Sequence, residues 1–194
     1  CSLVLLAAAI PAGAQQSGDF SYASDGTSIT ITRYNGNGGF VTIPDTIEGL
    51  PVTGIGSGAL NSCSNLTDVL IGNDVTDIGS GAFRLCTSLS SIALPSSVTS
   101  IGDGAFHSCT SLGSITIPRR VASLGARVFS GCTSLMAIEV DELNPAYSSL
   151  EGVLFNKSQT LLIAYPAGKA GGYVIPNSVT GIGLDAFALC PGLT

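Results

Sequence analysis

Apolar positions return along this chain with a fixed spacing of 23 residues. An isoleucine or leucine followed by glycine occurs at Ile55, Ile78, Ile101 and Leu124. A second apolar column keeps the same spacing at Leu60, Phe83, Phe106 and Phe129. A period of this length with several phased apolar positions is the signature of a solenoid in which each repeat forms one turn.

Within one repeat, the pattern predicts a short strand and a return path. Leu89, Ile92 and Leu94 have the L-x-x-I-x-L spacing of a strand whose alternate side chains point inward. Pro95 ends the strand because proline has no N–H for a β-ladder. Apolar residues around Phe106 then fill the opposite wall. One such turn buries too little apolar surface to fold alone, so neighbouring turns must stack.

The repeats differ in length. Measured at the last strand residue, the turns start at Ile43, Ile71, Leu94, Ile117, Val140 and Ile175, and their lengths are 28, 23, 23, 23 and 35 residues. The longest, 141–174, lacks the phenylalanine and cysteine columns and contains two strand-like runs around residues 156–159, which predicts a projecting hairpin. The regular pattern resumes and stops at Leu193-Thr194, so we expect the solenoid to be truncated at its C-terminus.

The first 40 residues do not follow the repeat. An apolar run at 3–10 and the small-x-small sequence Ala12-Gly13-Ala14 predict that residues 1–14 are the remnant of a secretory signal peptide. This run is too short to span a bilayer, and the alternative is a buried strand or helix. Residues 15–40 hold two strand-like runs around Asp25-Gly26, a hairpin signal. We expect this hairpin to cap the first turn of a solenoid at 41–194.

The composition and charge of the chain limit the classes of partner that are expected. Seven Lys and Arg against thirteen Asp and Glu give a net charge of −6, which would repel a phosphate backbone, so nucleic acid is not an expected partner. Glycine runs such as IGDGA recur in every turn and precede no strong helix, so they do not predict nucleotide binding. We expect no cofactor.

Four cysteines also repeat every 23 residues, at Cys63, Cys86, Cys109 and Cys132. Stacked turns lie about 4.8 Å apart, so the outer two are too distant to share one zinc ion. Their parallel Cβ directions disfavour disulfides. We interpret them as buried free thiols and predict no metal site. His107, the one histidine, occupies a variable column with no fixed partner, and we therefore predict no catalytic residues and no enzyme activity.

Two longer phrases carry a family resemblance. ALPSSVTSIGDGAFHSCTSL and GVLFNKSQTLLIAYPAGKAGGYVIPNSVTGIG resemble the BspA-like leucine-rich repeat family of bacterial surface proteins over 41–194. The resemblance implies a right-handed leucine-rich repeat solenoid, mostly β and loop with short helical turns, and a parallel sheet on its concave face. It also implies an exported or surface-attached protein of a kind that in some members acts in adhesion to host matrix or to other cells. Arg119-Arg120-Val121-Ala122 departs from the usual S-x-V-T.

Two sets of residues are candidates for ligand binding. The first is the outward-facing strand positions, which are small and mostly uncharged: Asp68, Leu70, Ser91, Ala93, Ser114, Thr116, Ala137 and Glu139. They lack the aromatic and arginine anchors typical of hot spots, so affinity per turn is expected to be low. The second is a basic patch of Arg119, Arg120 and Arg127, which suits carboxylate or sulfate groups; the alternative is a solvated edge with no role.

Three hypotheses for function follow. The leading one is a secreted or cell-surface adhesion module that binds a protein or glycan on a matrix or another cell. The alternative is a structural spacer or stalk that presents another domain. A hydrolase of extracellular polymers is disfavoured because no paired acidic residues recur at a cleft. An uncovered last turn also favours end-to-end self-association.

Overall fold

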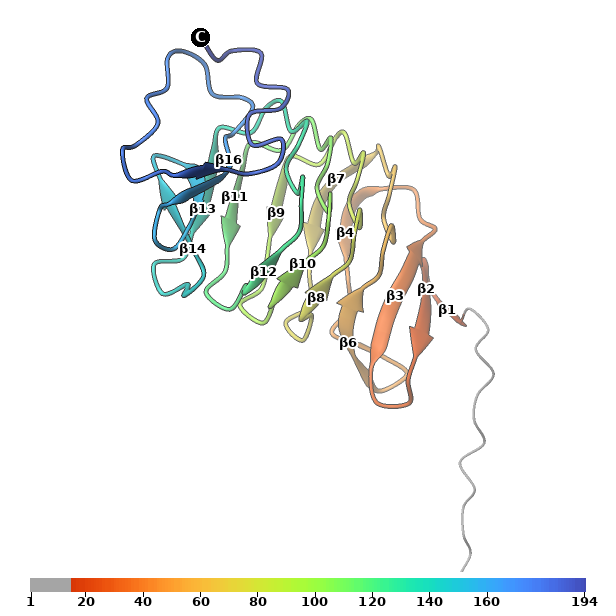
Figure 1. The fold of residues 1–194 in the computed structure, drawn as a ribbon. Helices are drawn as coiled ribbons and strands as arrows, with labels where there is room; N and C mark the ends of the chain where they lie inside the picture. The colour runs from red at the N-terminus through yellow and green to blue at the C-terminus, as the bar shows by residue number, and fades with distance from the viewer. Residues whose placement is uncertain (1–14) are drawn as a thin grey trace, which may run out of the picture.

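The computed structural model describes residues 15–194 as a β-solenoid (Figure 1). The predicted signal-peptide remnant, 1–14, lies outside the described residues. Two rows of parallel strands run along opposite sides of the solenoid, with the apolar core between them. The first row follows an antiparallel start and contains β3 (Ile29–Tyr34), β6 (Leu50–Ile55), β8 (Asp77–Ile78), β10 (Ser100–Ile101) and β12 (Ser123–Leu124).

The second row contains the strands that the L-x-x-I-x-L spacing predicts. They are β4 (Gly39–Thr42), β7 (Leu66–Leu70), β9 (Ser91–Ala93), β11 (Ser114–Ile117) and β13 (Ala137–Val140). From β6 and β7 onward, partners in both rows differ by the 23-residue period, as in Ser91 opposite Asp68 and Ser100 opposite Asp77. The parallel arrangement is confirmed, but this row is two sheets, β4-β7-β9 and β11-β13, with a break between β9 and β11.

The phased columns form the core. Phe83, Phe106 and Phe129 are buried and stack with ring centroids 5.4 Å and 5.9 Å apart. Beside them, the thiols of Cys86, Cys109 and Cys132 are buried. Each thiol donates a hydrogen bond, 3.0–3.1 Å long, to a carbonyl oxygen of the preceding turn, at Leu60, Phe83 and Phe106 respectively. The predicted column of buried thiols is therefore confirmed, with Cys63 and Cys190 only partly buried.

The expected short helical turns are not helices: within 15–194 the structure has no helix. Backbone hydrogen bonding explains this difference. The N–H groups of Ala82 and Arg84 bond three residues back within their own turn. The N–H groups of Phe83 and Leu85 instead reach the next turn, at the carbonyls of Ala105 and His107. Every second N–H group thus forms its hydrogen bond to the neighbouring turn, whereas a helix needs consecutive N–H groups to bond within one segment.

The N-terminal hairpin is present and has a third strand. β1 (Gln15–Ser17), β2 (Phe20–Ser24) and β3 are antiparallel, and β3 then pairs with β6 to start the parallel row. The Asp25 carboxylate accepts hydrogen bonds from the N–H groups of Thr27 and Ser28, each at 2.8 Å, and so fixes the turn. A short strand, β5 (Thr46–Ile47), pairs back onto β6.

The 35-residue turn supplies three strands of a small four-stranded sheet. β14 (Tyr147–Leu150), β15 (Val153–Asn156) and β16 (Leu161–Ala164) are antiparallel, and β17 (Gly181–Ile182) joins β16 in parallel. The two predicted strand-like runs are β15 and β16. They lie against the solenoid and do not project, because Leu154 is buried in the core and Ile138 N–H donates to the Gly152 carbonyl at 2.8 Å.

This turn also continues the aromatic column that the sequence appeared to lack. Tyr165 N–H donates to the Ala186 carbonyl, just as Phe106 N–H donates to that of Val128 in the regular turns. The ring of Tyr165 lies 5.4 Å from that of Phe187. The parallel row itself ends at β12, and β16 belongs to a separate sheet, β14-β15-β16-β17. We call this boundary between β12 and β16 the seam.

Candidate functional site

The exposed side of β4, β7, β9, β11 and β13 is the first candidate surface, which we call the sheet face. Strand residues alternate between buried and exposed, so all eight predicted strand positions lie on this face and outside the core. Their registers place Leu70 beside Ala93 and Thr116 beside Glu139. Ser91 Oγ donates to Asp68 Oδ1 at 3.0 Å, which joins two of the candidates across neighbouring turns.

An open groove of about 480 Å³ lies on the sheet face at the break between β9 and β11. Its lining includes four of the predicted residues, Ser91, Ala93, Ser114 and Thr116, with Pro118 and Asp141 at one end. Sequence periodicity predicted the strands but not the groove, because β9 and β11 carry the same pattern as strands that do pair.

An aromatic anchor on this face was missed by the sequence analysis. The side chain of Phe40 is 67% exposed on β4, and Phe40 pairs in register with Asp68. Leu70, 51% exposed, lies on the neighbouring strand. The available signal was the alignment of FVTI at 40–43 with DVLI at 68–71. The predicted cap ends at residue 40, inside β4, so Phe40 was assigned to the cap and its position on the sheet face was not predicted.

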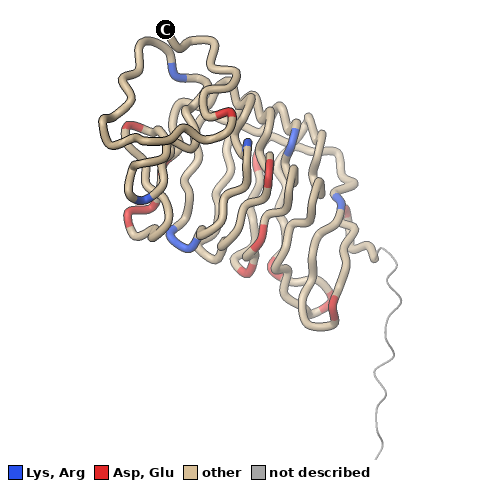
Figure 2. The backbone as a smooth tube through the Cα atoms, viewed as in Figure 1, with Lys and Arg blue, Asp and Glu red and all other residues tan. Residues whose placement is uncertain are grey.

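The three predicted arginines do not form one patch. Arg119 and Arg120 are exposed on the loop between β11 and β12. Asn144 holds that loop, because its Nδ2 donates to the carbonyls of Pro118 and Val121 at 2.8 and 3.0 Å. Figure 2 shows acidic and basic residues scattered over the turns without a continuous field of one sign.

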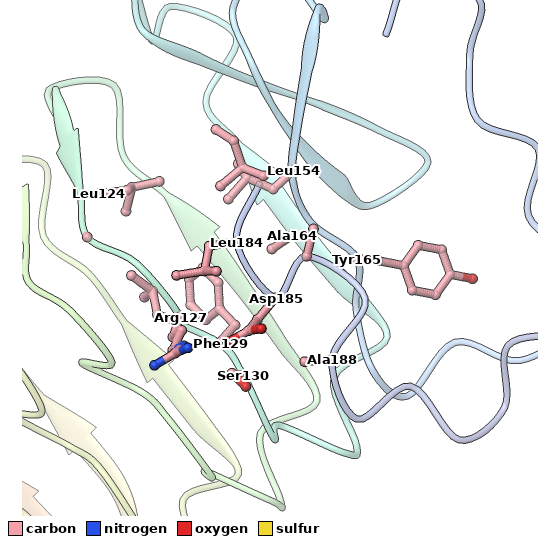
Figure 3. A pocket seen from close by; sticks show the side chains of 14 residues that line it. Leu124, Arg127, Phe129, Ser130, Leu154, Ala164, Tyr165, Leu184, Asp185 and Ala188 are labelled. Carbon is pink, nitrogen blue, oxygen red and sulfur yellow. Dashed lines mark hydrogen bonds and ion pairs between the residues drawn. The ribbon is translucent and has the colours of Figure 1, made fainter. Parts of the chain in front are cut away.

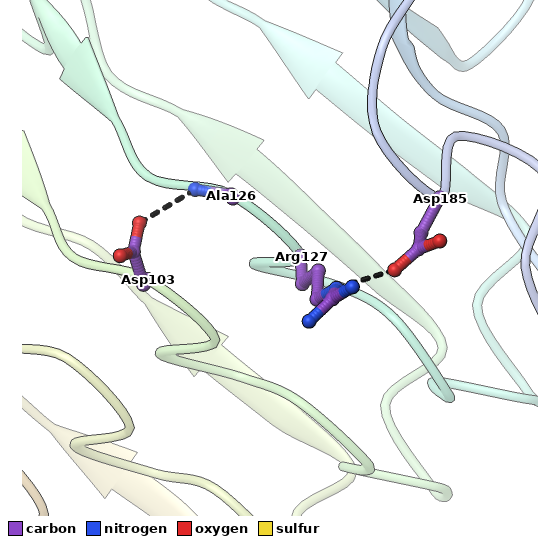
Figure 4. A network of polar contacts seen from close by, with 4 residues as sticks. All are labelled: Asp103, Ala126, Arg127 and Asp185. Atoms are coloured by element: carbon purple, nitrogen blue, oxygen red, sulfur yellow. Dashed lines mark hydrogen bonds and ion pairs between the residues drawn. The ribbon is translucent and has the colours of Figure 1, made fainter.

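Arg127 lies beyond β12 and reaches across the seam. Its Nε donates to Asp185 Oδ2, in the one ion pair found among residues 15–194 (Figure 4). On the near side, Asp103 Oδ1 accepts a hydrogen bond from Ala126 N–H at 2.7 Å. The ion pair therefore links the fourth regular turn to the last one, 58 residues later.

A small cavity of about 30 Å³ lies at the seam (Figure 3). Its wall is mainly apolar and comes from both sides, with Leu124 and Phe129 facing Leu154, Ala164 and Leu184. This volume has room for about one or two water molecules and is too small for a substrate. We interpret it as imperfect packing where the regular stack is interrupted.

The described residues offer few other groups that could form a metal or catalytic site. Between residues 15 and 194, no group of three His, Cys, Asp or Glu side chains lies close enough to hold a metal ion. His107 is partly buried, and its Nδ1 lies 2.8 Å from Ser108 Oγ. The same part of the chain has no helix of sufficient length and hydropathy to cross a membrane.

The chain resembles known repeat proteins in sequence and in structure. The model of the family described as the BspA type leucine rich repeat region matches residues 40–168 in six copies. A leucine-rich repeat protein from Bacteroides capillosus is 31% identical, with a TM-score of 0.60 over 66% of this chain and 98% of that one. No curated protein matches the chain.

Two longer crystal structures are also similar. A leucine-rich repeat protein from Eubacterium ventriosum is 27% identical, with a TM-score of 0.61, over 89% of this chain and 56% of that one. This chain thus spans little more than half the length of that relative. A pneumococcal vaccine antigen shares the fold at 21% identity, with a TM-score of 0.61 over 91% of this chain and 62% of that one.

Proposed function

Because the chain belongs to the BspA-type leucine-rich repeat family, we propose that it is an exported, non-catalytic binding module whose ligand docks on the sheet face. The ligand is a protein or glycan segment on a matrix or another cell. The observation that carries the proposal is the exposed pair Phe40 and Leu70 on the same face as the groove between β9 and β11.

The chemistry of this face suits docking. Removing apolar surface from water contributes roughly 25 cal/mol per Å², so two exposed apolar side chains on adjacent strands are a favourable anchor. The hydroxyl groups of Ser114 and Thr116 line the groove and offer both donors and acceptors to a polar ligand. Only one aromatic anchor is present on the face, so we expect weak single-site affinity that improves with multivalent display.

The test is binding of a multivalent display of this chain to immobilised matrix proteins, glycans and bacterial cells. Phe40→Ser with Leu70→Ser is expected to lower retention at least about tenfold, because each exposed anchor contributes about 1 kcal/mol or more. The matched control is Leu143→Ser, which removes an apolar side chain that is 74% exposed and lies outside the five strands of the sheet face and the lining of the groove. Binding should persist in EDTA.

A spacer function predicts that the chain binds none of these immobilised surfaces. If none of these surfaces retains the multivalent chain, the binding module is excluded and the spacer hypothesis replaces it. If the control variant loses as much binding as the double variant, retention reflects general hydrophobic adsorption and the sheet face is not the site.

A further inference from the structure

A second surface lies on the turns that connect the two strand rows. Three side chains that carry or can accept positive charge, Arg84, His107 and Arg127, come from three consecutive turns. They line one open depression of about 430 Å³, together with Ser80 and Asp103. We call this depression the turn-face site. The spacing along the chain predicts one patch of Arg127 with Arg119 and Arg120, whereas in the structure Arg127 shares this depression with Arg84.

Arg127 occupies an unusual backbone position for a charged side chain. The equivalent positions in the three preceding turns are Gly58, Gly81 and Gly104, all with positive φ. Arg127 adopts φ 57° there, and Asp185, the equivalent residue of the last turn, adopts φ 56°. A left-handed conformation costs a residue with a Cβ about 1 kcal/mol. Arg127 and Asp185, which stand where the other turns have glycine, form the ion pair with each other.

The ion pair orients Arg127 without using all of its donors. Only Nε is engaged with Asp185, and neither terminal amino group makes a hydrogen bond to residues 15–194. Arg84 is exposed and has no acidic partner in the same range. The one acid in the depression, Asp103, directs Oδ1 to the Ala126 N–H. The site therefore presents free guanidinium donors, which recognise sulfate and carboxylate groups well.

We propose that the turn-face site binds the sulfate or carboxylate groups of an anionic polysaccharide. Consecutive turns are about 4.8 Å apart, so side chains from three turns span about 10 Å along the solenoid. That length matches several anionic groups on one polymer better than a single small anion. His107 lies between the two arginines in turn order; its Nδ1 contacts Ser108 Oγ, and its Nε2 makes no hydrogen bond to residues 15–194. This site is separate from the sheet face and does not depend on the function proposed for it.

The test measures binding of dextran sulfate by isothermal titration calorimetry, with neutral dextran as the reference polymer. Arg84→Gln with Arg127→Gln should weaken binding at least about tenfold, since charge-assisted hydrogen bonds are the stronger class. Arg119→Gln with Arg120→Gln is the matched control, because it removes the same net charge from another loop and should change affinity less than about threefold. Sodium sulfate should compete better than sodium chloride at equal ionic strength.

Arg84→Gln alone keeps the seam ion pair and should still weaken binding, so it guards against a folding defect in the double variant. Equal losses in the two double variants would mean attraction to overall charge and would overturn the proposal. A loss confined to the Arg119 and Arg120 variant would move the site to that loop. Equal binding of dextran sulfate and neutral dextran by the native chain would also overturn it.

Discussion

At the scale of single residues, Asn144 is the clearest case of a polar group that the fold requires. It is the one fully buried polar side chain among residues 15–194, and its amide is satisfied on both sides. Nδ2 donates to two carbonyls of the Arg119 loop, while Oδ1 accepts from the N–H groups of Ala146 and Tyr147 at 2.8 Å. One side chain thus joins the extended turn to the preceding turn.

Asn144→Asp should destabilise the protein by about 3 kcal/mol or more. The substitution removes two donors and places a carboxylate oxygen against two carbonyl oxygens without water. Urea unfolding followed by circular dichroism measures the change. Asn61→Asp, at an exposed position in a regular turn, is the control and should change stability by less than about 0.5 kcal/mol. A buried-site variant as stable as this control would contradict the role given to Asn144.

At the scale of elements, the stacked turns account for what the sequence could and could not predict. The 23-residue phasing of Ile78 and Phe83 is a packing requirement repeated in every turn, so it was readable without a structure. Tyr165 fills the same column, but after a longer turn and with another residue type, so its spacing gave no signal. The contact of Arg127 with Asp185 arises only where the seam lets two distant turns meet.

The cysteine column predicts a dependence of stability on alkaline pH. Burial raises the pKa of the Cys86 thiol to about 12 from an ordinary value of 9.0. The folded state therefore holds this proton more tightly than the unfolded state, and the stabilisation is complete below pH 9 and lost as pH rises toward 12. Urea unfolding between pH 7 and 11 should show a steeper decline above pH 9 for the native chain than for Cys86→Ala. Parallel curves would refute the assignment.

At the scale of the whole molecule, the last turn leaves apolar side chains uncovered. Ile182, Leu184 and Leu189 are all exposed there, whereas Ile101, at the position of Ile182 in an earlier turn, is buried. We expect self-association that increases with protein concentration, because contiguous exposed apolar surface favours it. Analytical ultracentrifugation should detect oligomers, and Leu184→Ser with Leu189→Ser should reduce them. Leu143→Ser is the control, and a native chain that stays monomeric at every concentration would contradict the expectation.

The hydrogen bonds between turns also determine how the peptide dipoles are oriented along the solenoid axis. On the turn side, N–H groups such as that of Phe106 donate forward to the following turn, at Val128. On the strand side, donation runs both ways, backward from the Gly102 N–H to Ile78 and forward from the Ile43 N–H to Leu70. The peptide dipoles of the strands therefore largely cancel, whereas those of the turn side add along the solenoid. The turn side directs its N–H groups toward the following turn and its carbonyl oxygens toward the preceding one, so a neighbouring turn fits there in one orientation only.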